Sequence, residues 1–228
     1  MLISNRGAIA SEPQPDPSVT LRVDLSRRIL ARKLLCVSSS SGLPGAIAKG
    51  SEPTDITLSE CKLLDVLLKR INRLLELAPR MAKARWNNKI SGETREQKEQ
   101  KLAEIEQAMS AADPAERQFV RRFFQSQFHA GSMLQLTLEK DWKRIPSHFN
   151  DPPDFDVLSQ TFRQRTFELL TALREARPLL ARSSARQYLQ LRELELTVPA
   201  VRNVVRHEML RVLLNPGFIP TAVSNRDN

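Results

Sequence analysis

The chain has 228 residues and a mass of 25.9 kDa, enough for one domain with a buried core. Lysine and arginine number 35 against 26 acidic residues, and this formal charge of +9 favours an anionic substrate or partner. A membrane span is excluded, since about eighteen apolar residues nowhere run together. Two cysteines, three histidines without metal-ligand spacing and no glycine-rich phosphate loop argue against disulfide scaffolds, zinc enzymes and nucleotide-binding enzymes.

The first 55 residues differ in composition from the rest of the chain. They contain four of the seven glycines and a serine run from Ser38 to Ser41, which predicts a loose N-terminal extension. Basic residues, a short apolar patch at 34–37 and the Ala46-Ile47-Ala48 segment resemble the three regions of a secretory signal, although the apolar patch is short and far from Met1. Residues 1–55 are therefore expected to be an export signal or a disordered leader.

From residue 56 to 216 the spacing of apolar residues predicts an all-α bundle of about six helices. Thr57-x-x-Glu60 is a capping box, and apolar residues follow it at intervals of three and four as far as Trp86. This pattern predicts a long first helix with a kink or bulge at Pro79. Residues 217–228 are expected to form a C-terminal tail.

The remaining helices are bounded by recognisable start and stop signals. Ser91 or Gly92 is expected to begin the second helix, and Asp113-Pro114 fits the N-cap and first position of the third. Prolines at 152 and 153 predict a break before the fourth helix. Two shorter helices are expected near 183–196 and 199–214, and no alternating strand pattern competes with them.

Four motifs follow one another along the helical region. They are Met81-Ala82-Lys83-Ala84-Arg85-Trp86, the segment Ile90 to Glu96, Phe119-Val120-x-x-Phe123-Phe124-x-x-Gln127-x-x-Ala130 with Gln135, and Asp141-Trp142 ahead of Pro152-Pro153-Asp154. In this order they resemble the all-helical chorismate mutases, most closely the exported branch, over roughly residues 57 to 175. The resemblance implies a cofactor-free isomerase that converts chorismate, a small dianion, to prephenate.

The implied reaction needs a preorganised cage and no nucleophile or general base. The cage holds a reactive conformer of the substrate and donates hydrogen bonds to the ether oxygen, where negative charge develops. By resemblance, Arg73 and Arg95 bind the substrate carboxylates, which arginine can grip bidentately. Arg85 and Gln135 correspond to the catalytic groups beside the ether oxygen, and a glutamine there donates without needing acid.

Two features leave the pocket open to alternatives. The residue that reaches the ether oxygen is Arg85 when Trp86 anchors the comparison and Lys83 when the spacing to Arg95 does, so Lys83 is kept as a substrate-binding candidate. Arginines on helices also face solvent more often than they face a pocket. The central question is therefore whether these cations converge.

Two further positions depart from the pattern of the family. Gly131 stands where a serine or threonine hydroxyl is usual, unless Ser132 shifts into its place. Ser159 stands where an arginine completes the carboxylate clamp, and Arg163, one helical turn later, is the substitute that we expect to bind substrate. These departures motivate the alternative of a catalytically impaired relative that acts in ligand binding or protein interaction.

The resemblance also carries expectations about partners and compartment. It implies a dianionic small-molecule substrate, no cofactor or metal, no nucleic acid and no membrane partner, and exported relatives often form homodimers. The protein is expected to be periplasmic or secreted, or cytoplasmic if the N-terminal segment is not an export signal. A basic nucleic-acid-binding protein is a weaker alternative based on the charge of +9, without a recognised motif.

Overall fold

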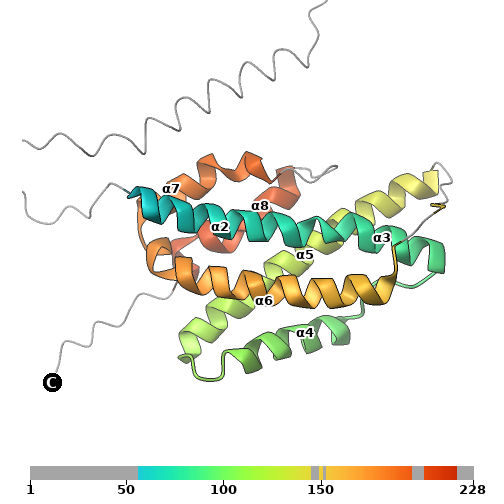
Figure 1. Cartoon of the computed structure of the whole chain (residues 1–228), viewed down its shortest axis with the longest axis horizontal. Helices are drawn as coiled ribbons and strands as arrows, with labels where there is room; N and C mark the ends of the chain where they lie inside the picture. The colour runs from blue at the N-terminus through green and yellow to red at the C-terminus, as the bar shows by residue number, and fades with distance from the viewer. Residues whose placement is uncertain (1–55, 145–148, 151–152, 197–202, 220–228) are drawn as a thin grey trace, which may run out of the picture. The chain divides into compact units, whose positions relative to one another are not determined.

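The computed structural model describes residues 56–144, 149–150, 153–196 and 203–219 (Figure 1). The chain divides into two units, Met1–Ile47 and Ala48–Asn228, and every described residue belongs to the second. The described residues contain helices and no strand, so the all-α prediction is confirmed for them. The predicted extension at 1–55 lies outside these ranges.

Seven α-helices and two short 3-10 helices make up the described fold. They are α2 (Leu58–Leu75), α3 (Leu77–Asn88), α4 (Arg95–Ala108), α5 (Pro114–Arg144), α6 (Phe155–Leu180), α7 (Ser183–Leu191), η1 (Glu193–Glu195), α8 (Asn203–Leu214) and η2 (Pro216–Phe218). None of the helices in the described ranges combines the length and the apolar character needed to cross a lipid bilayer.

The first predicted helix is two helices, α2 and α3, that meet at Glu76. Thr57 caps α2 through the expected box, in which its side chain accepts from the Glu60 N–H and the Glu60 carboxylate accepts from the Thr57 N–H. The break lies three residues before Pro79, where the kink was predicted. Pro79 falls in the first turn of α3, because the missing proline N–H costs nothing where helical N–H groups are unpaired anyway.

The start of α4 also differs from the prediction. It begins at Arg95, after Ser91 and Gly92, because Thr94 and Gln97 form a second capping box. The third predicted helix begins as expected, with the Asp113 side chain accepting from the Glu116 N–H. As a result, the six residues between α3 and α4 form a connection instead of a helical turn.

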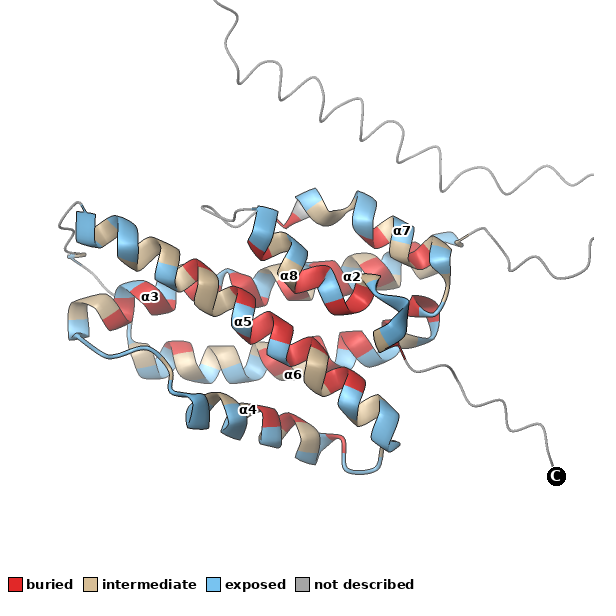
Figure 2. Ribbon diagram, turned by 180° about the vertical axis from the view of Figure 1, so that it is seen from behind, coloured by how far each residue is buried: buried red, intermediate tan, exposed pale blue. Residues whose placement is uncertain are grey.

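The helices bury one main apolar core. α2 packs along α6, α5 packs against α8 and α3, and α4 rests on α5. Seen from behind, buried residues gather along the middle of α5, and its two ends are largely exposed (Figure 2). The largest side chains that are almost fully buried include Phe119, Phe123, Phe124, Leu64, Leu67, Ile71 and Leu134. Burial of aromatic and aliphatic side chains of this kind supplies most of the stability of such a bundle.

The core continues to the end of the described chain. Phe218 packs against the main cluster and Ile219 is buried, two and three residues respectively past the predicted domain boundary at 216. Polar contacts also fix α8 to α5. The Gln127 Nε2 atom donates to the Met209 carbonyl at 2.7 Å. This contact fixes the Gln127 side chain beside the cavities described below.

Candidate functional site

Arg85 is a buried cation at the C-terminal end of α3. Its exposed fraction is 4%, and a buried charge must be paired or the fold loses several kcal/mol. Its Nη1 atom donates to Gln135 Oε1 at 2.8 Å, and its Nη2 atom donates to Glu93 Oε1 at 3.0 Å. The guanidinium carbon also lies 5.3 Å from the centre of the Phe155 ring. Helices α3, α5 and α6 and the α3–α4 connection thus converge on this one side chain.

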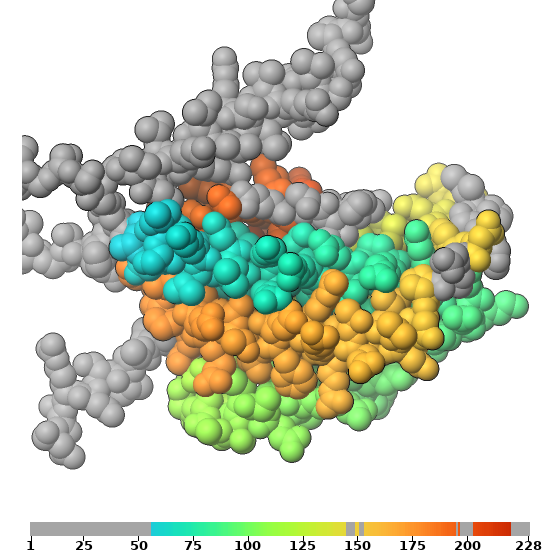
Figure 3. Space-filling view, in the orientation of Figure 1, coloured from blue at the N-terminus to red at the C-terminus, as the bar shows by residue number. Residues whose placement is uncertain are grey.

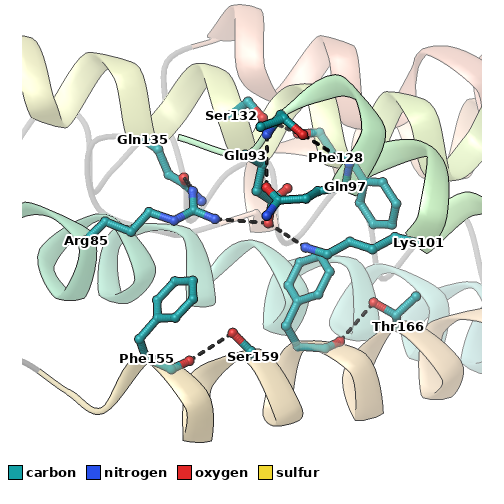
Figure 4. A network of polar contacts seen from close by, with 12 residues as sticks. Arg85, Glu93, Gln97, Lys101, Phe128, Ser132, Gln135, Phe155, Ser159 and Thr166 are labelled. Carbon is teal, nitrogen blue, oxygen red and sulfur yellow. Dashed lines mark hydrogen bonds and ion pairs between the residues drawn. The ribbon is translucent and has the colours of Figure 1, made fainter. Parts of the chain in front are cut away.

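Gln135 and Arg85 come together although they are 50 residues apart in the sequence. Gln135 lies on α5, one helical turn after Gly131, and its carbonyl oxygen is occupied by the arginine (Figure 4). The Gln135 amide nitrogen is the remaining hydrogen-bond donor of this side chain. The structure therefore assembles the two residues named as catalytic from the resemblance, while their chemical roles stay predictions.

Glu93 and Lys101 complete the network, and the sequence analysis predicted neither as a site residue, although Glu93 lies within the Ile90 to Glu96 motif. The Glu93 carboxylate accepts from Arg85 and also pairs with the Lys101 ammonium (Figure 4). Burial alone would raise the pKa of the Glu93 carboxyl, but the charges of Lys101 and Arg85 outweigh burial and lower the pKa. Lys101 also lies 4.4 Å from the centre of the Phe162 ring. The site is therefore a chain of alternating charges over aromatic rings.

Besides a cavity of about 580 Å³ that is lined by Arg85, Trp86 and Glu139, among others, three further cavities adjoin this network. A cavity of about 350 Å³ is lined by Arg85, Glu93, Lys101 and Phe155, among others, and it falls in the size range of ligand pockets. A second, of about 160 Å³, continues between α4 and α6 and shares Lys101 and Ser159 with the first. On the surface, α6 and α4 form adjoining strips along this side of the molecule (Figure 3).

The third cavity is small and lies deeper. It measures about 30 Å³, room for about two water molecules, and Gln127, Ser132, Gln135 and Glu93 contribute its polar atoms. Gln127 Oε1 is buried there and has no hydrogen-bond partner among the described atoms. Gly131 lines the same cavity, and a Cβ at this position would meet nothing within 4 Å. The missing hydroxyl at Gly131 therefore leaves open space beside the network.

The structure does not bring Arg73, Lys83 and Arg95 into this site. Each is exposed, and none lines the cavities described above. The reason is helical phase, because a residue two positions from a pocket residue points to the opposite side of its helix. Arg73 stands two residues before Leu75, Lys83 two before Arg85, and Arg95 two before Gln97, and each of these later residues lines a cavity.

Arg163 reaches the rim of the site and not its centre. Its side chain is 68% exposed, and its Nε atom lies 3.2 Å from the Glu104 carboxylate across the groove between α6 and α4. Ser159, one turn earlier, lines two of the cavities, but its hydroxyl donates to the Phe155 carbonyl at 2.9 Å. Ser132 likewise donates to the Phe128 carbonyl at 2.9 Å. What α6 contributes to the site is therefore mainly aromatic side chains, those of Phe155 and Phe162.

Lys83 belongs to a different aromatic group at the end of α3. Its ammonium lies 5.0 Å from the centre of the Phe149 ring. Trp142 packs edge-on against both Trp86, at 5.6 Å between ring centres, and Phe149, at 4.8 Å. These rings join the end of α5 to α3 and help to hold Arg85, next to Trp86, in place.

Comparison with known proteins does not assign the chain to a family. No protein-family model matches the chain, and no curated protein matches it. In the described part of the chain, no three histidine, cysteine, aspartate or glutamate residues come together as a metal site would require. The fold and site define a helical bundle with a buried, internally paired arginine beside ligand-sized cavities.

Proposed function

We propose that this chain is a chorismate mutase-like helical protein that binds a small cyclic carboxylate in the cavity beside Arg85, without the full clamp of a mutase. The observation that carries the proposal is the buried Arg85 guanidinium, which opens onto a cavity of about 350 Å³. A preformed cation in a cavity that is lined mainly by polar side chains, with Ile90 and Phe155 as its large apolar members, is suited to orient a carboxylate. The Phe155 and Phe162 rings nearby suit a flat or cyclic ligand body.

A second candidate is the chorismate mutase reaction itself, the cofactor-free rearrangement of chorismate to prephenate. The contact between Arg85 and Gln135 favours it, because these residues stand at the positions that the resemblance assigns to the ether oxygen. Preorganised donors at a developing oxyanion lower a barrier by roughly 3 to 4 kcal/mol each. The exposed positions of Arg73 and Arg95 favour binding over turnover, since two carboxylates would lack their expected partners.

Turnover and binding assays on the full chain separate these candidates. Purified protein at neutral pH is mixed with chorismate, whose loss is followed by ultraviolet absorbance, and is titrated separately with benzoate in a calorimeter. The binding proposal expects heat from benzoate and chorismate loss no faster than in buffer. Chorismate loss that Gln135→Ala abolishes and the distant Glu99→Gln leaves unchanged would establish the mutase instead. If the chain gives no heat with benzoate and does not speed chorismate loss, both candidates are contradicted.

A further inference from the structure

We infer that Glu93 makes the cavity beside Arg85 selective for ligands with one carboxylate over ligands with two. This inference rests on the proposed function, because it concerns the same cavity, and it adds the charge that a ligand can carry. It starts from the charges that line the two connected cavities. They are the cations Arg85, Lys101 and Arg163 and the carboxylates Glu93 and Glu104.

The charge count of the lined region leaves one uncompensated cation. Three cations stand against two carboxylates, and each carboxylate is already held in an ion pair within the site. A ligand with one carboxylate would bring the region to neutrality. A ligand with two would leave a net negative charge in partly buried surroundings, where like charges repel more strongly than in water.

Glu93 also occupies the donors that a second ligand carboxylate would need. It takes the Nη2 atom of Arg85 at 3.0 Å and the ammonium of Lys101, while Gln135 takes Nη1. Only the Nε atom of Arg85 is buried without a hydrogen-bond partner among the described atoms. Each Nη atom of the guanidinium therefore already donates to a protein acceptor, and a second ligand carboxylate would meet the negative charge of Glu93 at the same end of the arginine.

The position of Glu93 is fixed by its neighbours in the chain. Thr94, the next residue, is the N-cap of α4, and its capping box with Gln97 sets where the helix begins. Lys101 stands two turns further along the same helix and pairs with Glu93 from above the Phe162 ring. Glu93 is thus a built part of the cavity wall and not a freely moving side chain.

Benzoate and isophthalate test the inference, because they share a ring and differ by one carboxylate. Calorimetric titration of the full chain is expected to show benzoate binding about tenfold more tightly than isophthalate. Glu93→Gln, a neutral side chain of the same shape, is expected to tighten isophthalate binding about tenfold. Glu99→Gln is the matched control, since it removes the same charge from α4 outside the cavities, and it should change neither affinity.

Three outcomes overturn the inference in distinguishable ways. Equal affinities of the wild-type chain for the two probes would remove the selectivity. An unchanged preference in Glu93→Gln would remove Glu93 as its cause, and if that variant does not fold, Glu104→Gln makes the same change in charge at the cavity wall. Absence of binding by either probe, to wild type and variants alike, would instead contradict the proposed function on which the inference rests.

Discussion

Burial of the Arg85 side chain is favourable only because two acceptors meet it. An isolated guanidinium with an exposed fraction of 4% would cost several kcal/mol of folding free energy. Gln135 and Glu93 supply one acceptor each, on separate elements, so the contact also fixes α5 relative to the α3–α4 connection. The same pairing sets the electrostatics of the cavity, which is why one residue links stability to the proposed binding.

The Glu93 carboxyl predicts how stability depends on pH. Its pKa is lowered in the folded chain from the ordinary value of 4.5, so the folded state favours the ionised form. The stability that Glu93 contributes is therefore complete above about pH 4.5, decreases as the pH falls below that value, and is lost below the lowered pKa. Thermal unfolding of Glu93→Gln across pH 3 to 7 is expected to show a flatter acid limb than wild type.

The control for this prediction is Glu175→Gln, which changes an exposed carboxylate on α6. Its acid limb is expected to follow that of the wild-type chain. The account would be contradicted if Glu93→Gln lost stability on acidification as steeply as wild type, because the charge on Glu93 would then contribute nothing that depends on pH.

At the residue scale the sequence predicted part of the site. The resemblance named both Arg85 and Gln135 as site residues. Trp86 anchors the comparison at Arg85, and the motif that begins at Phe119 contains Gln135. Glu93 lies within the Ile90 to Glu96 motif but was given no role, since nothing in a linear motif shows that a carboxylate in a connection will fold back onto a cation eight residues before it. The Thr94-x-x-Gln97 box was the available signal, because it marks residue 93 as the last residue before the cap.

The α3–α4 connection is the element that places Glu93. It starts at Lys89, which caps α3 in the left-handed conformation with a φ of 53°, a conformation that a non-glycine residue adopts at a cost of about 1 kcal/mol. The Ile90 N–H then donates to the Arg85 carbonyl at 3.0 Å. At its other end Thr94 begins α4. Six residues therefore reverse the chain tightly enough to return Glu93 to Arg85.

Two threonine caps give a matched prediction at the scale of the helix. Thr57→Ala and Thr94→Ala each remove a capping box, and each is expected to lower the free energy of unfolding by about 1 kcal/mol. Only Thr94→Ala is expected to weaken benzoate binding as well, because Thr94 lies next to Glu93 and lines the cavity. Chemical denaturation and calorimetric titration measure the two effects.

Thr57 is the control, because its cap lies at the opposite end of the α2–α3 run from Arg85. Equal loss of benzoate affinity in both variants would show that general stability, and not the position of Glu93, governs binding. Unchanged affinity in Thr94→Ala would show that the cap has no part in shaping the site.

The direction in which each side chain points from its helix determines which of the predicted cations reach the site. The sequence places Arg73, Lys83 and Arg95 close to apolar residues, but closeness along the chain does not say on which side of the helix a residue points. The break at Glu76 adds to the difficulty, since it separates the phase of α2 from that of α3. A prediction that treats the first helix as continuous cannot carry a side-chain direction from Arg73 to Arg85.

The arrangement of the whole bundle explains why one polar network forms among so many exposed charges. The described chain carries other ion pairs, for example between Arg121 and Glu106 and between Arg177 and Glu116, and in both pairs the arginine keeps more than a quarter of its side chain accessible to solvent. The Arg85 network differs because α3, α5 and α6 enclose it. Among the described residues, Arg85 is the one buried cation, and it gives the fold its candidate site.

The fold itself was the most predictable feature at the scale of the molecule. The intervals of three and four between apolar residues, the capping boxes and the scarcity of glycine after residue 56 all predict helices, and the described residues form helices. The packing of α2 along α6 and of α5 against α8 could not be read in the same way. Hydrogen bonds between these helices join residues 98 apart for α2 and α6 and 82 apart for α5 and α8. Periodicity shows that a helix has an apolar face without showing which helix covers it.

The most direct test compares two arginines in one titration. Benzoate is titrated into the wild-type chain, Arg85→Met and Arg73→Met, with circular dichroism to verify that each variant is folded. Because a charge-assisted hydrogen bond contributes about 1.5 to 3 kcal/mol, Arg85→Met is expected to weaken binding at least about tenfold, while exposed Arg73→Met leaves it unchanged. A folded Arg85→Met variant that binds benzoate as tightly as wild type would contradict the account.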